Sequence, residues 1–161
     1  MSSSTPPYIA GLDRYDRAIL RLLQSNARIS NRELSDAVSL SPSTVFERVK
    51  RLSKRGFILG FQTRLNPEKL GAGQIAFVQV TLEATRQDSI GAMRAAIAAQ
   101  PEILDCYAMA GEFDFLLKVR THDMLACQDV VSAALRGLFG VKQVRTYAVM
   151  SPLKESAEVP V

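Results

Sequence analysis

The chain has 161 residues, of which 47% are hydrophobic and 22% charged, and its formal net charge is +4. This length suits one domain or two small ones, and the composition is typical of a globular protein. No apolar run approaches the ~20 residues of a membrane span, and residues 1–7 lack a basic-then-apolar secretion signal. These features predict a cytoplasmic protein without a membrane partner. Cys106 and Cys127 lack CxxC spacing, and with a single histidine we expect core thiols and no metal site.

The positive charge is concentrated in the first part of the chain. Residues 1–64 contain eleven Lys or Arg and five Asp or Glu, a net charge of +6, whereas residues 65–161 contain nine and eleven, a net charge of −2. Only the N-terminal part therefore carries the positive field expected of a phosphate-binding surface.

The first predicted helix begins after a flexible N-terminal tail, residues 1–11. Asp13 is its expected N-cap, and it ends near residues 25–26. Its buried stripe follows helical spacing. The stripe consists of Leu12, Tyr15, Ile19, Leu22 and Leu23.

Two short helices joined by a tight turn are predicted between residues 29 and 58. Ser30 and Glu33 have the S-x-x-E form of a capping box, and the following helix should bury Leu34, Ala37 and Val38. Ser41 then offers a second N-cap, followed by a proline at the first helical position.

The second of these helices should bury Val45, Val49 and Leu52 and end at Gly56. The pair matches a helix-turn-helix unit, whose second helix enters a major groove. Five cations and one acid lie between residues 41 and 55, which is lopsided for an ordinary solvated helix and favours DNA binding. The side chains expected to face solvent are Ser43, Thr44, Glu47, Arg48, Lys50, Arg51, Lys54 and Arg55.

Apolar residues alternate from Ile58 to Leu65, which predicts a short strand. The Asn-Pro and Gly residues that follow place a hinge at 64–73. The predicted organisation is therefore a DNA-binding domain at 12–63, a second domain at 74–152 and a polar C-terminal tail at 153–161.

The second domain reads as strand 74–84, helix 88–99, strands 103–110 and 113–119, helix 123–138 and strand 141–150. This order predicts an α+β fold, a ferredoxin-like βαββαβ sandwich with both helices on one face of the sheet. The open face makes sheet-to-sheet dimerisation an expectation. We expect it to carry Ile75, Phe77, Gln79 and Thr81. In the first helix of this domain we expect Ile90, Met93 and Ile97 to face inward. The second helix is expected to run through the apolar residues Met124, Leu125, Val131, Leu135 and Leu138.

An enzyme is the competing class. The sequence has no Gly-rich phosphate loop, no HExxH and no GxSxG turn. Glu112 and Asp114 would form an acid/base pair only with a histidine or metal partner, and His122 precedes a helix as a surface residue. We therefore predict no catalytic site.

Several stretches together resemble the Lrp/AsnC family, the leucine-responsive or "feast/famine" transcriptional regulators of bacteria and archaea. They are LDRYDRAIL, RISNRELSDAVSLSPSTVFERVKRLSKRGFI, LNPEKLG, AGEFDFLLKV and GVKQVRTYAVM, in this order from Leu12 to about Lys154. Within the family the chain is more similar to the leucine-responsive branch than to the asparagine-responsive one. The resemblance implies a winged helix-turn-helix head that binds double-stranded DNA.

The resemblance further implies that residues 41–55, from the Ser41 cap onward, form the recognition helix. Residues that reach bases or phosphates would be Ser43, Thr44, Glu47, Arg48 and Arg51, with Lys54 and Arg55 on the backbone. Glu47 would either accept a hydrogen bond from a cytosine amine or orient Arg51.

In this family the C-terminal domain binds an amino acid at the contact between dimers, without a cofactor. The matching positions are Met109, Gly111 and Asp114, with Met124, Thr146 and Tyr147 as weaker candidates. Asp114 would pair with an ammonium group; alternatively, it is a strand-end residue that satisfies turn amides.

The implied assembly is a homodimer that forms an octamer or similar ring and wraps DNA as a nucleoid-associated protein. The expected effector is leucine or a similar aliphatic amino acid, and the regulated genes would serve amino-acid metabolism. The alternatives are a local regulator that responds to another amino acid, such as proline or a branched-chain catabolite, or a sensing module that controls an enzyme and does not bind DNA.

Overall fold

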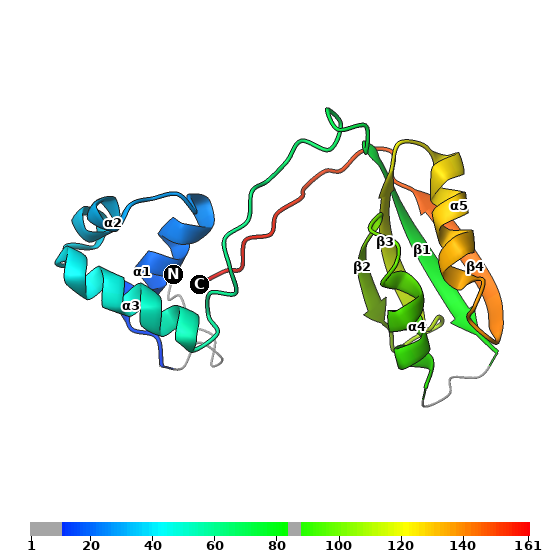
Figure 1. The fold of residues 1–161 in the computed structure, drawn as a ribbon, viewed down its shortest axis with the longest axis horizontal. Coiled ribbons are helices and arrows are strands. Elements are labelled where there is room, and N and C mark those ends of the chain that lie inside the picture. The colour runs from blue at the N-terminus through cyan, green and yellow to red at the C-terminus, as the bar shows by residue number, and fades with distance from the viewer. Residues whose placement is uncertain (1–10, 84–87) are drawn as a thin grey trace, which may run out of the picture. The chain divides into compact units, whose positions relative to one another are not determined.

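A computed structural model describes residues 11–83 and 88–161, which form two compact units (Figure 1). Within the described chain, one unit comprises residues 11–64 and Glu155–Val161, and the other comprises Leu65–Lys154. The predicted N-terminal tail lies outside the described residues except for Gly11. None of the described helices is long and apolar enough to cross a membrane.

The first unit, here called the head, contains α1 (Arg14–Ser25), α2 (Asn31–Val38) and α3 (Pro42–Lys54). Each helix begins at the predicted cap. The Asp13 carboxylate accepts from the Asp16 amide at 2.8 Å, and Ser30 and Glu33 form the full capping box. Ser41 Oγ accepts from the Thr44 amide at 3.2 Å. Such caps satisfy N–H groups that a helix leaves unpaired at its first turn.

The core of the head differs from the predicted stripes by single residues. In α1 the buried residues are Asp16, Ile19 and Leu20, whereas Tyr15 is only partly buried. In α2 the prediction that Ala37 is buried was wrong, because Ala37 is exposed and Ser35 is buried.

These shifts have a physical cause. Ser35 can be buried because its hydroxyl donates to the Arg32 carbonyl at 2.7 Å. Asp16 is buried because two arginines of α3 contact it, as described below. Ile19, Leu34, Val45 and Leu52 form the centre of the core.

The predicted strand at residues 58–65 was also wrong. This segment forms no strand in the structure, and no described residue pairs with it in a sheet. Leu59 is 96% exposed and Phe61 57% exposed. A strand needs a neighbour to receive its backbone hydrogen bonds, so alternation of apolar residues alone does not form one.

The second unit contains β1 (Gln74–Leu82), α4 (Ser89–Ile97), β2 (Ile103–Ala108), β3 (Phe115–Thr121), α5 (Met124–Leu135) and β4 (Val141–Ala148). The strand order is β2-β3-β1-β4, and every neighbouring pair is antiparallel. Both helices cover the same face of the sheet (Figure 1). The predicted ferredoxin-like topology is confirmed.

Alternate residues of the central strands build the core of this unit. Val78 and Val80 of β1 and Leu117 of β3 are fully buried under the helices. On the opposite face Phe77, Gln79 and Thr81 are partly exposed, as predicted, although Ile75 is buried. The prediction for one helical residue was wrong: Ile90 is 52% exposed, because α4 packs through a narrower stripe than its apolar content suggests.

The C-terminal residues 155–161 pack on α1 of the head. Gln24 donates to the Val159 carbonyl at 2.9 Å and accepts from the Val159 amide at 2.7 Å. Arg21 donates to the carbonyl of Val161 at 2.9 Å, and the Val161 side chain contacts the apolar core of the head. The chain therefore passes twice between the two units, once at residues 64–65 and once at residues 154–155.

Candidate nucleic-acid interface and ligand site

The helix α3 has one apolar side and one polar side. Val45 and Leu52 are fully buried and fix the helix on the head. Ser43, Glu47 and Lys50 lie at helical spacing on the other side and are exposed, as is Lys54 one turn later. We call these four residues the outer face of α3. Lys50 was placed toward solvent from the sequence but not selected as a DNA contact.

Hydroxyl groups gather at the N-terminus of α3. Ser41 Oγ lies 3.0 Å from Ser43 Oγ and 2.7 Å from Thr44 Oγ1. The unpaired N–H groups and the dipole of a helix N-terminus favour anions such as phosphate. This end of α3 is therefore suited to a DNA backbone.

Arg48 points toward α1. Its Nη1 donates to Asp13 Oδ2 at 2.6 Å and to Asp16 Oδ1 at 2.8 Å, and its guanidinium lies 5.4 Å from the centre of the Tyr15 ring. Burial opposes ionisation of Asp13, but the Asp16 amide and Arg48 outweigh it and lower the pKa of Asp13. The same bonds, to Asp13 first and then to Asp16, raise the pKa of Arg48. Arg48 thus joins α3 to α1.

Arg51 makes the same kind of contact. Its Nη2 donates to both carboxylate oxygens of Asp16, at 2.9 and 3.0 Å. The Asp16 side chain is only 2% exposed, whereas that of Arg51 is 49% exposed. A buried carboxylate requires charged or hydrogen-bonding partners, and Asp16 obtains them from α3.

Sequence reasoning missed Asp16. The available signal was an acid four residues after Leu12 and three before Ile19, that is, at a position of the helix that faces the core.

The last predicted contact, Arg55, donates through Nη1 to the Gly11 carbonyl at 3.0 Å and lies 4.8 Å from the centre of the Phe57 ring. Lys50 and Lys54 make no ion pair among the described residues. The predicted DNA contacts therefore divide into arginines that bind other parts of the head, the hydroxyl residues Ser41 and Thr44 at the N-terminus of α3, and outer-face residues that are directed to solvent.

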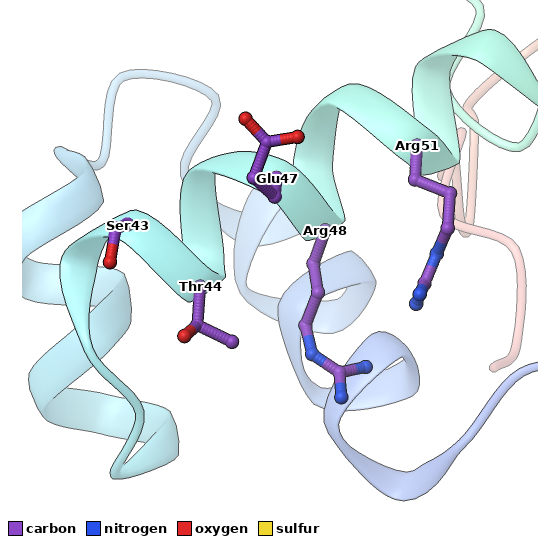
Figure 2. A pocket seen from close by; sticks show the side chains of 5 residues that line it. All are labelled: Ser43, Thr44, Glu47, Arg48 and Arg51. Carbon is purple, nitrogen blue, oxygen red and sulfur yellow. The ribbon is translucent and has the colours of Figure 1, made fainter.

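An open hollow of about 550 Å³ lies along the polar surface of α3. It is lined by Ser43, Thr44, Glu47, Arg48 and Arg51. Figure 2 shows that the Glu47 carboxylate leaves the helix in one direction and that the Arg48 and Arg51 side chains leave it in another, toward α1.

Three of the predicted ligand residues lie together between β2 and β3. The Met109 amide donates to the Asp114 carbonyl at 2.8 Å, with Gly111 in the loop between them. Asp114 Oδ2 accepts from the Leu82 amide at 2.8 Å, so this carboxylate oxygen binds the end of β1. That contact is the strand-end role considered as the alternative for Asp114.

The other three candidates lie elsewhere in the same domain. Met124 begins α5, after the far end of β3, and a strand of that length spans about 20 Å. Thr146 and Tyr147 are consecutive on β4, the opposite edge strand from β2, and so face opposite sides of the sheet. One chain alone does not bring the six residues around a single ligand. Among the described residues no cluster of His, Cys, Asp or Glu could hold a metal ion.

Two family descriptions match the chain. Residues 12–58 match "Winged helix-turn-helix DNA-binding", and residues 75–159 match "Lrp/AsnC ligand binding domain". The leucine-responsive regulatory protein of Salmonella typhimurium is 45% identical over 145 residues, which cover 90% of this chain and 88% of that protein. The protein of the same name from Escherichia coli is 44% identical over the same shares.

Solved structures agree with these matches. A transcriptional regulator from Neisseria meningitidis in complex with L-Met superposes with a TM-score of 0.85 at 34% identity, covering 92% of this chain and 96% of that chain. AsnC from Escherichia coli superposes with a TM-score of 0.83 at 26% identity, covering 92% and 99%. The chain therefore belongs to the Lrp/AsnC family and is a DNA-binding transcriptional regulator, not an enzyme, with a winged helix-turn-helix domain followed by a ligand-binding domain.

Proposed function

We propose that this regulator binds its operator through the outer face of α3 and that a free amino acid, bound by the C-terminal domain, alters DNA binding and the transcription of amino-acid metabolism genes. The observation that carries the proposal is that α3 has one side packed on the head and one side exposed to solvent. One side is fixed to the head, and the other presents Ser43, Glu47 and Lys50 to solvent. A recognition helix requires this combination of a rigid support and a polar exposed face.

The cations of α3 serve two purposes. Lys50 and Lys54 bind DNA phosphates, which supply most of the affinity and no sequence information. Arg48 and Arg51 hold α3 on α1, and the half-exposed Arg51 also reaches a phosphate. This revises the role that the family resemblance implied for Arg48, from a contact with bases or phosphates to a supporting residue.

The effector pocket forms between copies of the chain. The dispersion of the six candidate residues over one domain supports a shared pocket, because a second copy can supply the missing wall. Met109 is 41% exposed and offers an adaptable apolar contact for an aliphatic side chain. Leucine is favoured by the names of the relatives, and methionine is the second candidate because the Neisseria meningitidis protein was solved with L-Met.

Association begins at the open face of the sheet. Phe77 is partly exposed there, and Tyr147, on the neighbouring strand, is 47% exposed. Covering these aromatic side chains in a homodimer removes apolar surface from water. Further assembly to an octamer or similar ring would place several heads along bent DNA, as expected of a cytoplasmic, nucleoid-associated protein.

The test combines two measurements on the full-length chain. Thermal shift against a panel of free amino acids identifies the effector, because a ligand that binds only the folded state raises the melting temperature. Fluorescence anisotropy with labelled DNA, at several salt concentrations and with and without that amino acid, then measures DNA binding. The proposal predicts a steep loss of affinity with salt, near −0.9 per neutralised phosphate, and an effector-dependent affinity. DNA binding that is insensitive both to salt and to every amino acid would contradict it.

A further inference from the structure

We propose that Glu47 determines specificity by reading a cytosine: its carboxylate accepts a hydrogen bond from the N4 amino group of that base in the major groove. This inference rests on the proposed function of α3 as the recognition helix. It assigns a base to one residue of the outer face.

The charge of Glu47 is the first reason. It is the only acid among residues 41–55, and it is exposed near the middle of the helix. A carboxylate brought close to DNA is repelled by the phosphates, so at this position it opposes binding unless it meets a donor. Among the usual pairings between side chains and bases, Glu and Asp accept from the amino group of cytosine.

The absence of a partner within the head is the second reason. An acid on a helix often pairs with a cation three or four residues later, here Lys50 or Arg51. Arg51 instead donates to both oxygens of Asp16, and Glu47 has no hydrogen bond or ion pair in residues 11–83 and 88–161. The carboxylate therefore does not orient Arg51 and remains available for a base.

The position of Glu47 is the third reason. Ser43 lies one turn before it and Lys50 one turn after it on the same face. The Glu47 side chain also extends away from the arginines that contact α1 (Figure 2). When the outer face enters a groove, Glu47 is central among its side chains and reaches base edges, while Lys50 and Lys54 reach the backbone.

The experiment is selection of binding sites from randomised double-stranded DNA by the full-length protein and two variants, Glu47→Gln and Glu47→Ala. The matched control is Asp36→Asn, which removes an exposed carboxylate from α2 outside the outer face. We expect the unmodified protein and the control to select cytosine at one position of each half-site. Glu47→Ala should lower the preference for cytosine there by about 5- to 140-fold and bind random DNA more tightly. Glu47→Gln should shift the preference toward adenine.

The possible failures are distinguishable. If the unmodified protein enriches no sequence, the proposed function fails together with this inference. If it enriches a defined site and Glu47→Ala enriches the same site with unchanged preference at every position, only the role of Glu47 is overturned. A position sensitive to Glu47 that carries a base other than cytosine also overturns it. Because Glu47 is exposed, both variants should fold, and their circular dichroism spectra check this.

Discussion

The buried carboxylate of Asp16 provides a sharp test of how α3 is held. In Asp16→Ala the head loses one bond to Arg48, two to Arg51 and a long capping-box bond from the Asp13 amide at 3.4 Å, which contributes little at that distance. The Arg48 side chain is 19% exposed, so its charge-assisted bond should contribute about 1.5–3 kcal/mol. The Arg51 side chain is 49% exposed and can turn into water, which limits its contribution to about 0.2–1 kcal/mol. We therefore expect a loss of about 2–4 kcal/mol.

Hydrogen exchange of the amides of α3 measures this loss within the head alone. Since 1.4 kcal/mol corresponds to a factor of ten, exchange should accelerate by about 30- to 700-fold. Asp36→Ala, which removes an exposed acid from α2, should change the free energy of opening by less than about 0.5 kcal/mol.

Double-mutant cycles separate the two arginines. The coupling energy of Asp16 with Arg48 should be about 1.5–3 kcal/mol, and that with Arg51 should be below about 1 kcal/mol. A loss below about 0.5 kcal/mol in Asp16→Ala would refute the argument, because the buried carboxylate would then contribute nothing to holding α3.

Three further predictions concern other parts of the molecule. Gln24→Ala removes both bonds to Val159, at about 0.5–1.5 kcal/mol each, so residues 155–161 should be cleaved faster in limited proteolysis. Gln128→Ala, at an exposed position of α5, should leave the rate unchanged. The pKa of Asp13 is lowered below 3.8, so its stabilisation of α1 is complete above pH 3.8 and is lost as the pH falls through the lowered pKa. Asp13→Asn should therefore have a lower melting temperature at neutral pH, and its melting temperature should fall less than that of the unmodified protein as the pH is lowered. Burial raises the pKa of the Cys127 thiol, so peptide mapping after native thiol labelling should find Cys127 unmodified, and fast labelling would contradict its burial.

The features predictable from the sequence are those that depend on neighbouring residues. The capping box of Ser30 and Glu33 and the cap at Ser41 involve partners three residues apart, and both are present in the structure. The order of strands and helices in the second unit follows from apolar periods of two and about four residues, and the ferredoxin-like topology follows from that order.

The features that sequence reasoning missed depend on contacts between distant parts of the chain. Arg48 and Asp16 are 32 positions apart, and Gln24 and Val159 are 135 apart. Charge alone indicates that arginines on α3 attract phosphates. It does not reveal that a buried acid on another helix, Asp16, already pairs with Arg48 and Arg51. The strand predicted at residues 58–65 was wrong for a related reason, since a strand depends on a partner that local alternation does not specify.

The candidate sites differ in how well the sequence locates them. The outer face of α3 follows from helical spacing, because one helix carries all of its residues. The ligand residues come from one loop, a helix end and a strand, so their grouping depends on the tertiary and quaternary arrangement. Asp114 illustrates this, because its carboxylate oxygen binds the Leu82 amide in the same domain.

The most direct test of the central claim is the salt dependence of DNA affinity for Lys50→Gln and Lys54→Gln, singly and together, compared with the unmodified protein. If the outer face of α3 lies against DNA, each variant should weaken binding to all sequences and reduce the slope of log K against log salt by about one. Slopes and affinities that stay unchanged in the double variant would show that α3 is not the surface that binds DNA.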